Sequence, residues 1–76
     1  MFKTNEEVRN LRKRYPEGTK VRLVNMNDVQ APPANTEGEV RYVDDIGQIH
    51  VKWNNGSTLA LIVGEDTFIL TEEKGR

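Results

Sequence analysis

Short runs of alternating apolar and polar residues, separated by turn-forming residues, fill the chain from Gly18 to residue 71. A period of two predicts strands that each bury one face. The runs are too short and too regularly interrupted for anything other than a small, mainly β domain. We expect five strands, at residues 19–26, 39–43, 48–53, 57–62 and 67–71.

The connections between these runs predict how the strands are arranged. The first connection, residues 27–38, contains two adjacent prolines and is a long loop, whereas residues 44–47 and 63–66 are short turns. The pair Asn55-Gly56 predicts a tight hairpin, because both residues tolerate a type I′ turn. This order favours a small, partly open, five-stranded SH3-like barrel. The main alternative is an OB-type barrel, which usually has more residues and a helix between its third and fourth strands.

A helical segment precedes the strands. Thr4 and Glu7 fit a capping box, in which each side chain satisfies the backbone donor of the other residue. Pro16 disfavours helical geometry at the residue before it, so the helix ends there. An apolar stripe with helical spacing should dock on the sheet and consists of Val8, Leu11 and Tyr15.

The chain is therefore predicted to be one domain in three parts: a docking helix in residues 1–17, a barrel in residues 18–71 and a flexible tail in residues 72–76. It has 76 residues and no cysteine, so no disulfide supports the fold and a packed core must do so. No apolar run is long enough to span a bilayer. We expect a cytoplasmic protein that does not bind membranes. The predicted core is Leu11, Val21, Leu23, Val40, Ile49, Val51, Leu59, Leu61 and Phe68.

Several elements occur in a characteristic order: YPEGTKVRLVNM, a spacer with APP, and then GEVRYVDDIGQIHVKWNNGSTLALIVGEDTFIL. Over residues 15–70 this order resembles the bacterial family called domain of unknown function 4314. Val63 stands where that pattern has a proline, which affects the stiffness of a turn rather than the fold. The resemblance implies a small bacterial protein, often encoded by phages or mobile elements, with no assigned activity.

Catalysis has little support in the sequence. A Ser/His/Asp arrangement would have to use the only histidine, His50, and Ser57, yet no nucleophile elbow or oxyanion loop accompanies them. Asp44 and Asp45 lack the alternating oxygen ligands of a calcium loop, so we expect them to bond the backbone of their own turn. We predict a protein that is not an enzyme and that needs neither a metal nor a cofactor.

Protein recognition is the predicted function. The candidate contact residues are three aromatic side chains and two neighbouring carboxylates that suit a basic ligand: Tyr42, Trp53, Tyr15, Asp44 and Asp45. Each aromatic residue also has a structural interpretation. Trp53 alternates in register with Ile49 and Val51, which favours the core. Tyr42 is in register with Val40, and Tyr15 belongs to the helix stripe. Whether the helix covers the usual SH3-like groove stays open.

Nucleic-acid binding is the first alternative, because the charges are unevenly distributed. Residues 1–22 hold seven basic and three acidic side chains, whereas residues 23–76 hold four basic and nine acidic ones. A basic helix surface beside an aromatic ring suits single strands, although the acidic remainder repels phosphate. The residues of this candidate surface are Arg9, Arg12, Lys13, Arg14 and Arg22.

A second alternative follows from the resemblance to mobile-element proteins. Such proteins often block a host defence system, by covering a host protein or by sequestering a nucleotide signal. A sequestering site needs cationic and aromatic side chains on an exposed face. Arg41, His50 and Lys52 are predicted to point outward from the sheet and are the candidates. The sequence leaves the oligomeric state open.

Overall fold

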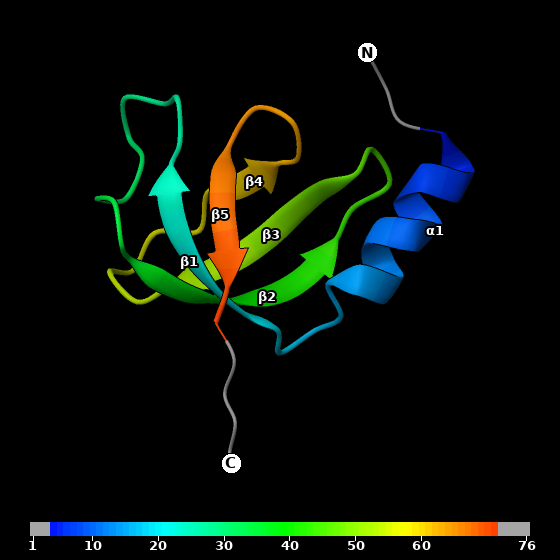
Figure 1. Ribbon diagram of the computed structural model, residues 1–76, viewed down its shortest axis with the longest axis horizontal. Coiled ribbons are helices and arrows are strands. Elements are labelled where there is room, and N and C mark those ends of the chain that lie inside the picture. Colours follow the sequence, from blue (N-terminus) through cyan, green and yellow to red (C-terminus); the bar gives the residue numbers. More distant parts are fainter. Residues whose placement is uncertain (1–3, 72–76) are drawn as a thin grey trace.

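The computed structural model describes residues 4–71, which form one helix and one antiparallel sheet (Figure 1). The sheet has the strand order β4-β3-β2-β1-β5, so β4 and β5 are its two edges. The predicted mainly β fold with one N-terminal helix is confirmed, but the sheet remains open and does not close into a barrel. The elements are α1 (Asn5–Arg14), β1 (Lys20–Asn25), β2 (Glu37–Val43), β3 (Gln48–Trp53), β4 (Ala60–Ile62) and β5 (Thr67–Leu70).

The helix begins as its capping sequence predicts. The Thr4 hydroxyl accepts a hydrogen bond from the Glu7 N–H at 3.1 Å, and the Glu7 carboxylate accepts one from the Thr4 N–H at 2.8 Å. The helix buries Val8 and Leu11 against the sheet, and it lies beside the end of β2 (Figure 1). Because a helix this short is marginal alone, this docking is what stabilises it.

Most of the predicted core residues are buried on the inner face of the sheet. Leu59 and Phe68 are the exceptions, since both are only partly buried. Trp53 is 1% exposed, and its indole N–H donates to the Leu59 carbonyl at 2.9 Å. The buried hydrophobic residues are Val8, Leu11, Val21, Leu23, Met26, Val40, Val43, Ile49, Val51, Trp53 and Leu61.

The fourth strand is shorter than predicted, because side chains at its expected start accept backbone hydrogen bonds that would otherwise go to β3. Asn55 accepts a hydrogen bond from the Ser57 N–H at 3.0 Å, and the Ser57 hydroxyl accepts one from the Leu59 N–H at 3.3 Å. These local bonds compete with strand pairing. Regular pairing with β3 therefore begins only at Ala60.

A β-bulge in β2 changes which side chains face the solvent. Val40 pairs with Val51 of β3, but the next pair joins Tyr42 to His50, so Arg41 is an extra residue. An extra residue reverses the alternation beyond it. Val43 is consequently buried, and Tyr42 lies on the outer face, where 55% of its surface is exposed.

Candidate functional site

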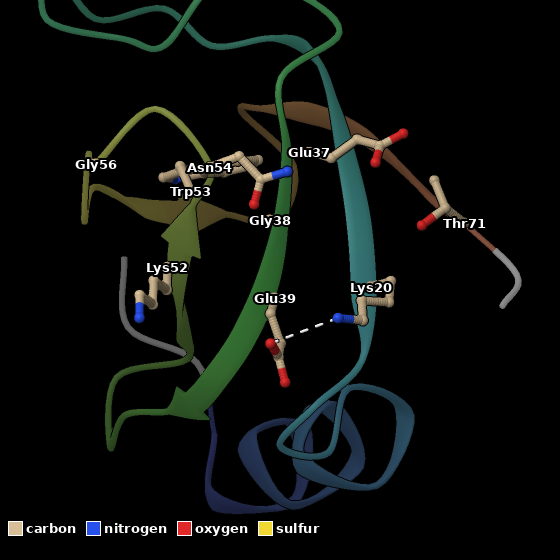
Figure 2. A pocket seen from close by; sticks show the side chains of 9 residues that line it. All are labelled: Lys20, Glu37, Gly38, Glu39, Lys52, Trp53, Asn54, Gly56 and Thr71. Atoms are coloured by element: carbon tan, nitrogen blue, oxygen red, sulfur yellow. Dashed lines mark hydrogen bonds and ion pairs between the residues drawn. The ribbon is translucent and has the colours of Figure 1, made fainter.

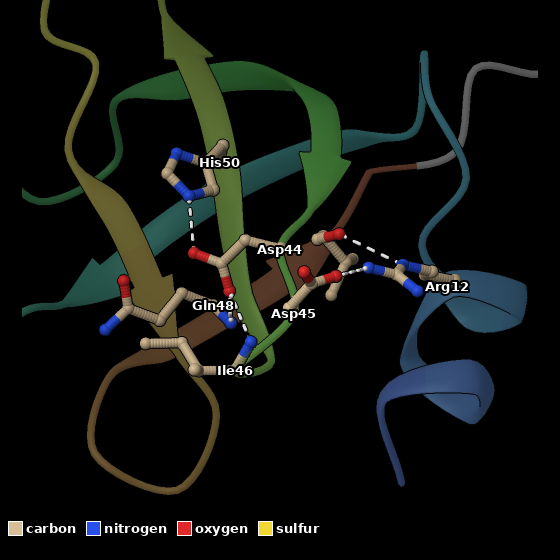
Figure 3. Close-up of polar contacts among 7 residues, drawn as sticks. Arg12, Asp44, Asp45, Ile46, Gln48 and His50 are labelled. Atoms are coloured by element: carbon tan, nitrogen blue, oxygen red, sulfur yellow. Dashed lines mark hydrogen bonds and ion pairs between the residues drawn. The ribbon is translucent and has the colours of Figure 1, made fainter. Parts of the chain in front are cut away.

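The exposed aromatic residue of β2 lies in a cluster formed by four parts of the chain. The end of β2, the turn to β3, His50 of β3 and the last turn of α1 meet here (Figure 3). We call this cluster the Tyr42 surface; it consists of Arg12, Arg41, Tyr42, Asp44, Asp45, Ile46 and His50.

The ring of Tyr42 is stacked on the imidazole of His50. The ring centroids are 4.4 Å apart, and the planes differ by only 10°. The two residues are cross-strand partners in the β2–β3 ladder, which places their side chains next to each other. The stack restricts the phenol ring while leaving more than half of the side chain exposed.

His50 is in turn fixed by Asp44. Its Nε2 lies 2.8 Å from one carboxylate oxygen of Asp44, and the other oxygen accepts hydrogen bonds from the Ile46 N–H at 3.1 Å and the Gln48 N–H at 2.9 Å (Figure 3). The expected bonds to the turn backbone are thus present for Asp44, whereas the Asp45 carboxylate contacts the Arg12 guanidinium instead. An ionised carboxylate only accepts, so His50 donates through Nε2 and its Nδ1 remains an acceptor when the ring is neutral.

These contacts lower the pKa of Asp44. Partial burial acts to raise the pKa, but the hydrogen bonds from His50, Gln48 and Ile46 favour the ionised form and outweigh the burial. The carboxylate therefore stays charged under mildly acidic conditions. The turn and the orientation of the imidazole depend on that charge.

Replacing Asp44 by asparagine is expected to lower stability most above the ordinary aspartate pKa of about 3.9. Because the pKa of Asp44 is lower in the folded protein, its stabilising contribution is complete above that value and is lost as pH falls through the folded-state pKa. We expect a cost of about 1–2 kcal/mol at neutral pH, the range of hydrogen bonds to charged groups. Thermal melts of both proteins from about pH 2 to 7 measure it. Asp45→Asn is the control, and an equal gap at all pH values would contradict the assignment.

Arg12 joins the helix to the turn between β2 and β3. Its Nε donates to the Val43 carbonyl at 3.1 Å, and its Nη2 lies 3.0 Å from a carboxylate oxygen of Asp45 (Figure 3). The Asp45 side chain is 99% exposed, so the ion pair itself adds little stability. The arrangement instead fixes where α1 sits relative to Tyr42.

A shallow groove of about 250 Å³ lies beside the Tyr42 ring, between the end of α1 and β2. Arg12 and Arg41 supply positive charge there, and Glu17 supplies one negative charge. The groove gives a partner residue a place next to the exposed ring. It is lined by Arg12, Tyr15, Pro16, Glu17, Arg41, Tyr42 and Val43.

Two of the three aromatic candidates differ from Tyr42. Trp53 is fully buried in the core, so its prediction as a contact residue is wrong and the structural interpretation holds. Tyr15 is half-buried; its ring lies 5.6 Å from that of Phe68, and the Arg14 guanidinium sits over it. Tyr15 therefore packs against the sheet, and it also lines the groove beside Tyr42.

The five basic candidates do not form one continuous basic surface. Arg12 is directed to Asp45, and Arg14 to the Tyr15 ring. Arg22 lies on the sheet, where its Nη2 is 3.1 Å from a Glu37 oxygen. Arg9 and Lys13 are exposed on the helix.

The three cationic candidates on the sheet are also divided. Arg41 and His50 belong to the Tyr42 surface, whereas Lys52 pairs with Glu39 across the β2–β3 ladder. Lys52 lines a separate hollow of about 440 Å³, shown in Figure 2, in which Lys20 is 3.5 Å from Glu39. Because this hollow carries charges of both signs, it is not the uniformly cationic pocket that an anionic signal requires.

No hydrogen bond joins Ser57 to His50 within residues 4–71, since His50 contacts Asp44 and the Ser57 hydroxyl accepts from the Leu59 N–H. His50 pairs with Ala60, whereas Ser57 lies in the hairpin turn, where its carbonyl accepts from Trp53. That part of the chain also holds no cluster of three potential metal-ligating residues. Its single helix has neither the length nor the apolar character to cross a membrane.

Sequence patterns did not predict the roles of two residues of the Tyr42 surface, Ile46 and Arg12. Ile46 is an exposed apolar residue at the tip of the turn, beside Asp45. Arg12 acts as a link to the turn rather than as part of a basic surface. The acidic pair at 44–45 was the one available signal, since it marks the turn that brings these side chains together.

Comparisons with known proteins give one match. Residues 4–71 match a family described as a domain of unknown function, DUF4314. No match was found among curated proteins or among solved structures. Since the matched residues include every helix and strand described above, the chain belongs to the DUF4314 family.

Proposed function

We propose that this protein is a non-enzymatic, cytoplasmic binding module that recognises another protein through the Tyr42 surface. The observation that carries this proposal is the exposed Tyr42 ring, held in one orientation by its stack on His50. Tyrosine is enriched among the residues that dominate binding energy at protein interfaces. A ring that is already ordered loses little conformational entropy when a partner covers it.

The surroundings of the ring supply the other features of a protein contact. Ile46 adds exposed apolar area, and Asp45 and Arg12 provide a polar rim. The groove beside the ring offers space for one side chain of the partner. A central aromatic anchor with a polar rim is the usual composition of such interfaces.

Charge favours a protein over a nucleic acid as the partner. The Tyr42 surface contains two carboxylates, and the basic residues once considered together are distributed over the helix and the sheet. The sequence pI of about 5.8 is also far from that of a dedicated nucleic-acid binder. The resemblance to mobile-element proteins makes bacterial host proteins the first partners to test.

Tyr42→Ala is expected to weaken partner binding by at least about 30-fold, the effect of losing about 2 kcal/mol at an interface anchor. The tagged protein is first used to capture partners from a bacterial host lysate with and without nuclease treatment, and bound proteins are identified by mass spectrometry. Affinities of the purified partner for both variants then follow from calorimetry. Since Tyr42 is exposed, the melting temperature should hardly change.

Val29→Ala serves as the matched control, because Val29 is fully exposed in the loop between β1 and β2 and lies outside the Tyr42 surface. It should bind like the original protein. Equal affinities of the Tyr42→Ala variant and the control would overturn the proposed site. Recovery that disappears with nuclease would instead favour nucleic acid, with Arg9 and Lys13 as the residues to replace.

A further inference from the structure

The two edges of the sheet are not equivalent. At β4, both backbone groups of Ile62 are already used: its N–H donates to the Asp66 carboxylate at 2.8 Å, and its carbonyl accepts from the Glu65 and Asp66 N–H groups. The turn after β4 therefore covers the Ile62 end of that edge. Covering an edge with a loop is one way in which proteins prevent strands from adding to a sheet.

The edge at β5 lacks such protection within residues 4–71. Among the helix and strands, β5 contacts only β1. Thr71 donates to the Lys20 carbonyl at 3.0 Å, which directs the backbone groups of Thr71 and Ile69 toward β1. Because the direction alternates along an antiparallel strand, the N–H and carbonyl groups of Phe68 and Leu70 point away from the sheet.

The exposed edge is also apolar and uncharged. Ile69 and Leu70 are 47% and 51% exposed, so two large apolar side chains lie next to each other on the edge strand. The segment from Thr67 to Thr71 contains no charged residue. An uncharged, apolar edge strand of this kind favours hydrogen bonding to a further strand over exposure to water.

The sequence of the segment identifies which strand fits. Thr-Phe-Ile-Leu-Thr is nearly the same read in either direction. In an antiparallel self-pairing centred on Ile69, threonine faces threonine at both ends, Phe68 faces Leu70 of the second copy, and the two Ile69 residues face each other. Each is a favourable cross-strand pair, and no charges are opposed within the segment.

We propose that two copies of this chain associate through β5, in antiparallel orientation, about a two-fold axis at Ile69. The outward groups of Phe68 and Leu70 then form the hydrogen-bonded pairs of a continuous ten-stranded sheet. Since both copies use the same segment, the assembly closes at two. The inference is independent of the Tyr42 surface, which lies on α1, the end of β2, the β2–β3 turn and β3, and includes no residue of β5.

Analytical ultracentrifugation of the purified protein tests the proposal. The measurements extend to about 1 mM, because a short edge pairing gives a weak complex. We expect a reversible shift from 8.7 kDa to twice that mass as concentration rises.

Two variants distinguish this interface from any other. Ile69→Lys places two like charges opposite each other and should raise the dimer dissociation constant at least about tenfold. Leu70→Pro removes an outward N–H without disturbing the ladder to β1, and it should have a similar effect. Val24→Lys, at an exposed apolar position of β1, is the matched control and should dimerise normally.

Circular dichroism confirms that each variant is folded. A protein that is monomeric at every concentration would overturn the proposal. So would a dimer that both β5 variants leave unchanged, because the contact would then lie elsewhere. A captured foreign protein that competes for β5 would assign the edge to a different partner and also count against it.

Discussion

Trp53→Ala is expected to leave a large fraction of the protein unfolded at physiological temperature. Trp53 is the largest of the fully buried side chains, and its indole N–H bonds Leu59 in the segment before β4. Removing a buried tryptophan costs about 3–5 kcal/mol. That loss is comparable with the whole stability of a domain of this size, roughly 5 kcal/mol.

Urea denaturation followed by far-UV circular dichroism measures the loss. Trp53→Phe is the informative companion, because it keeps most of the buried ring but removes the hydrogen bond to Leu59. Its smaller cost should combine the lost hydrogen bond, about 1 kcal/mol, with the unfilled part of the indole volume. If Trp53→Ala lowered the melting temperature by less than about 4 °C, a loss below about 1 kcal/mol, the burial of Trp53 would be refuted.

Gly38→Ala is expected to cause the second largest loss. A Cβ atom at Gly38 would lie 2.6 Å from a methyl carbon of Val51, 2.8 Å from the Trp53 ring and 2.9 Å from the Lys52 carbonyl oxygen. None of these three atoms can move easily, because two belong to buried core side chains and the third is a backbone oxygen of β3. Overpacking of this kind costs about 1–3 kcal/mol or more, and we expect the upper end.

Gly56→Ala separates this steric effect from the general cost of replacing glycine. Gly56 has a φ of +94°, and nothing lies within 4 Å of a Cβ placed there, so only backbone strain of about 1–2 kcal/mol is expected. Thermal melts of the two variants should therefore rank Gly38→Ala as the less stable. A reversed order would show that the space around Gly38 adapts to a methyl group.

The fold was predictable where local signals agree with the tertiary structure. The capping residues Thr4 and Glu7 placed the start of the helix correctly. Alternation identified most of the core, because the inner face of a sheet selects apolar residues at every second position. A partly open barrel was predicted, but the extent of the opening was not predictable, because closure depends on how far β4 and β5 curve toward each other.

Alternation failed at Tyr42 and Val43 for a physical reason. Strict alternation from Val40 places Tyr42 inside and Val43 outside, whereas the bulge at Arg41 produces the opposite. Neither residue carries a bulge signal, because the register is set by the partner strand. The candidate site was thus predictable as a set of residues, but its arrangement depends on contacts distant in sequence, such as that between Arg12 and Asp45.

The pairing of β1 with β5 also determines the order in which the domain can assemble. The β2–β3 and β3–β4 ladders join neighbouring segments, but Val21 pairs with Leu70, near the opposite end of the chain. Such a contact closes a long loop and is kinetically the most demanding. During synthesis β1 can pair with β2 before β5 has been made. The edge of β1 that binds β5 then stays unpaired, and the five-stranded sheet forms only after β5 has left the ribosome.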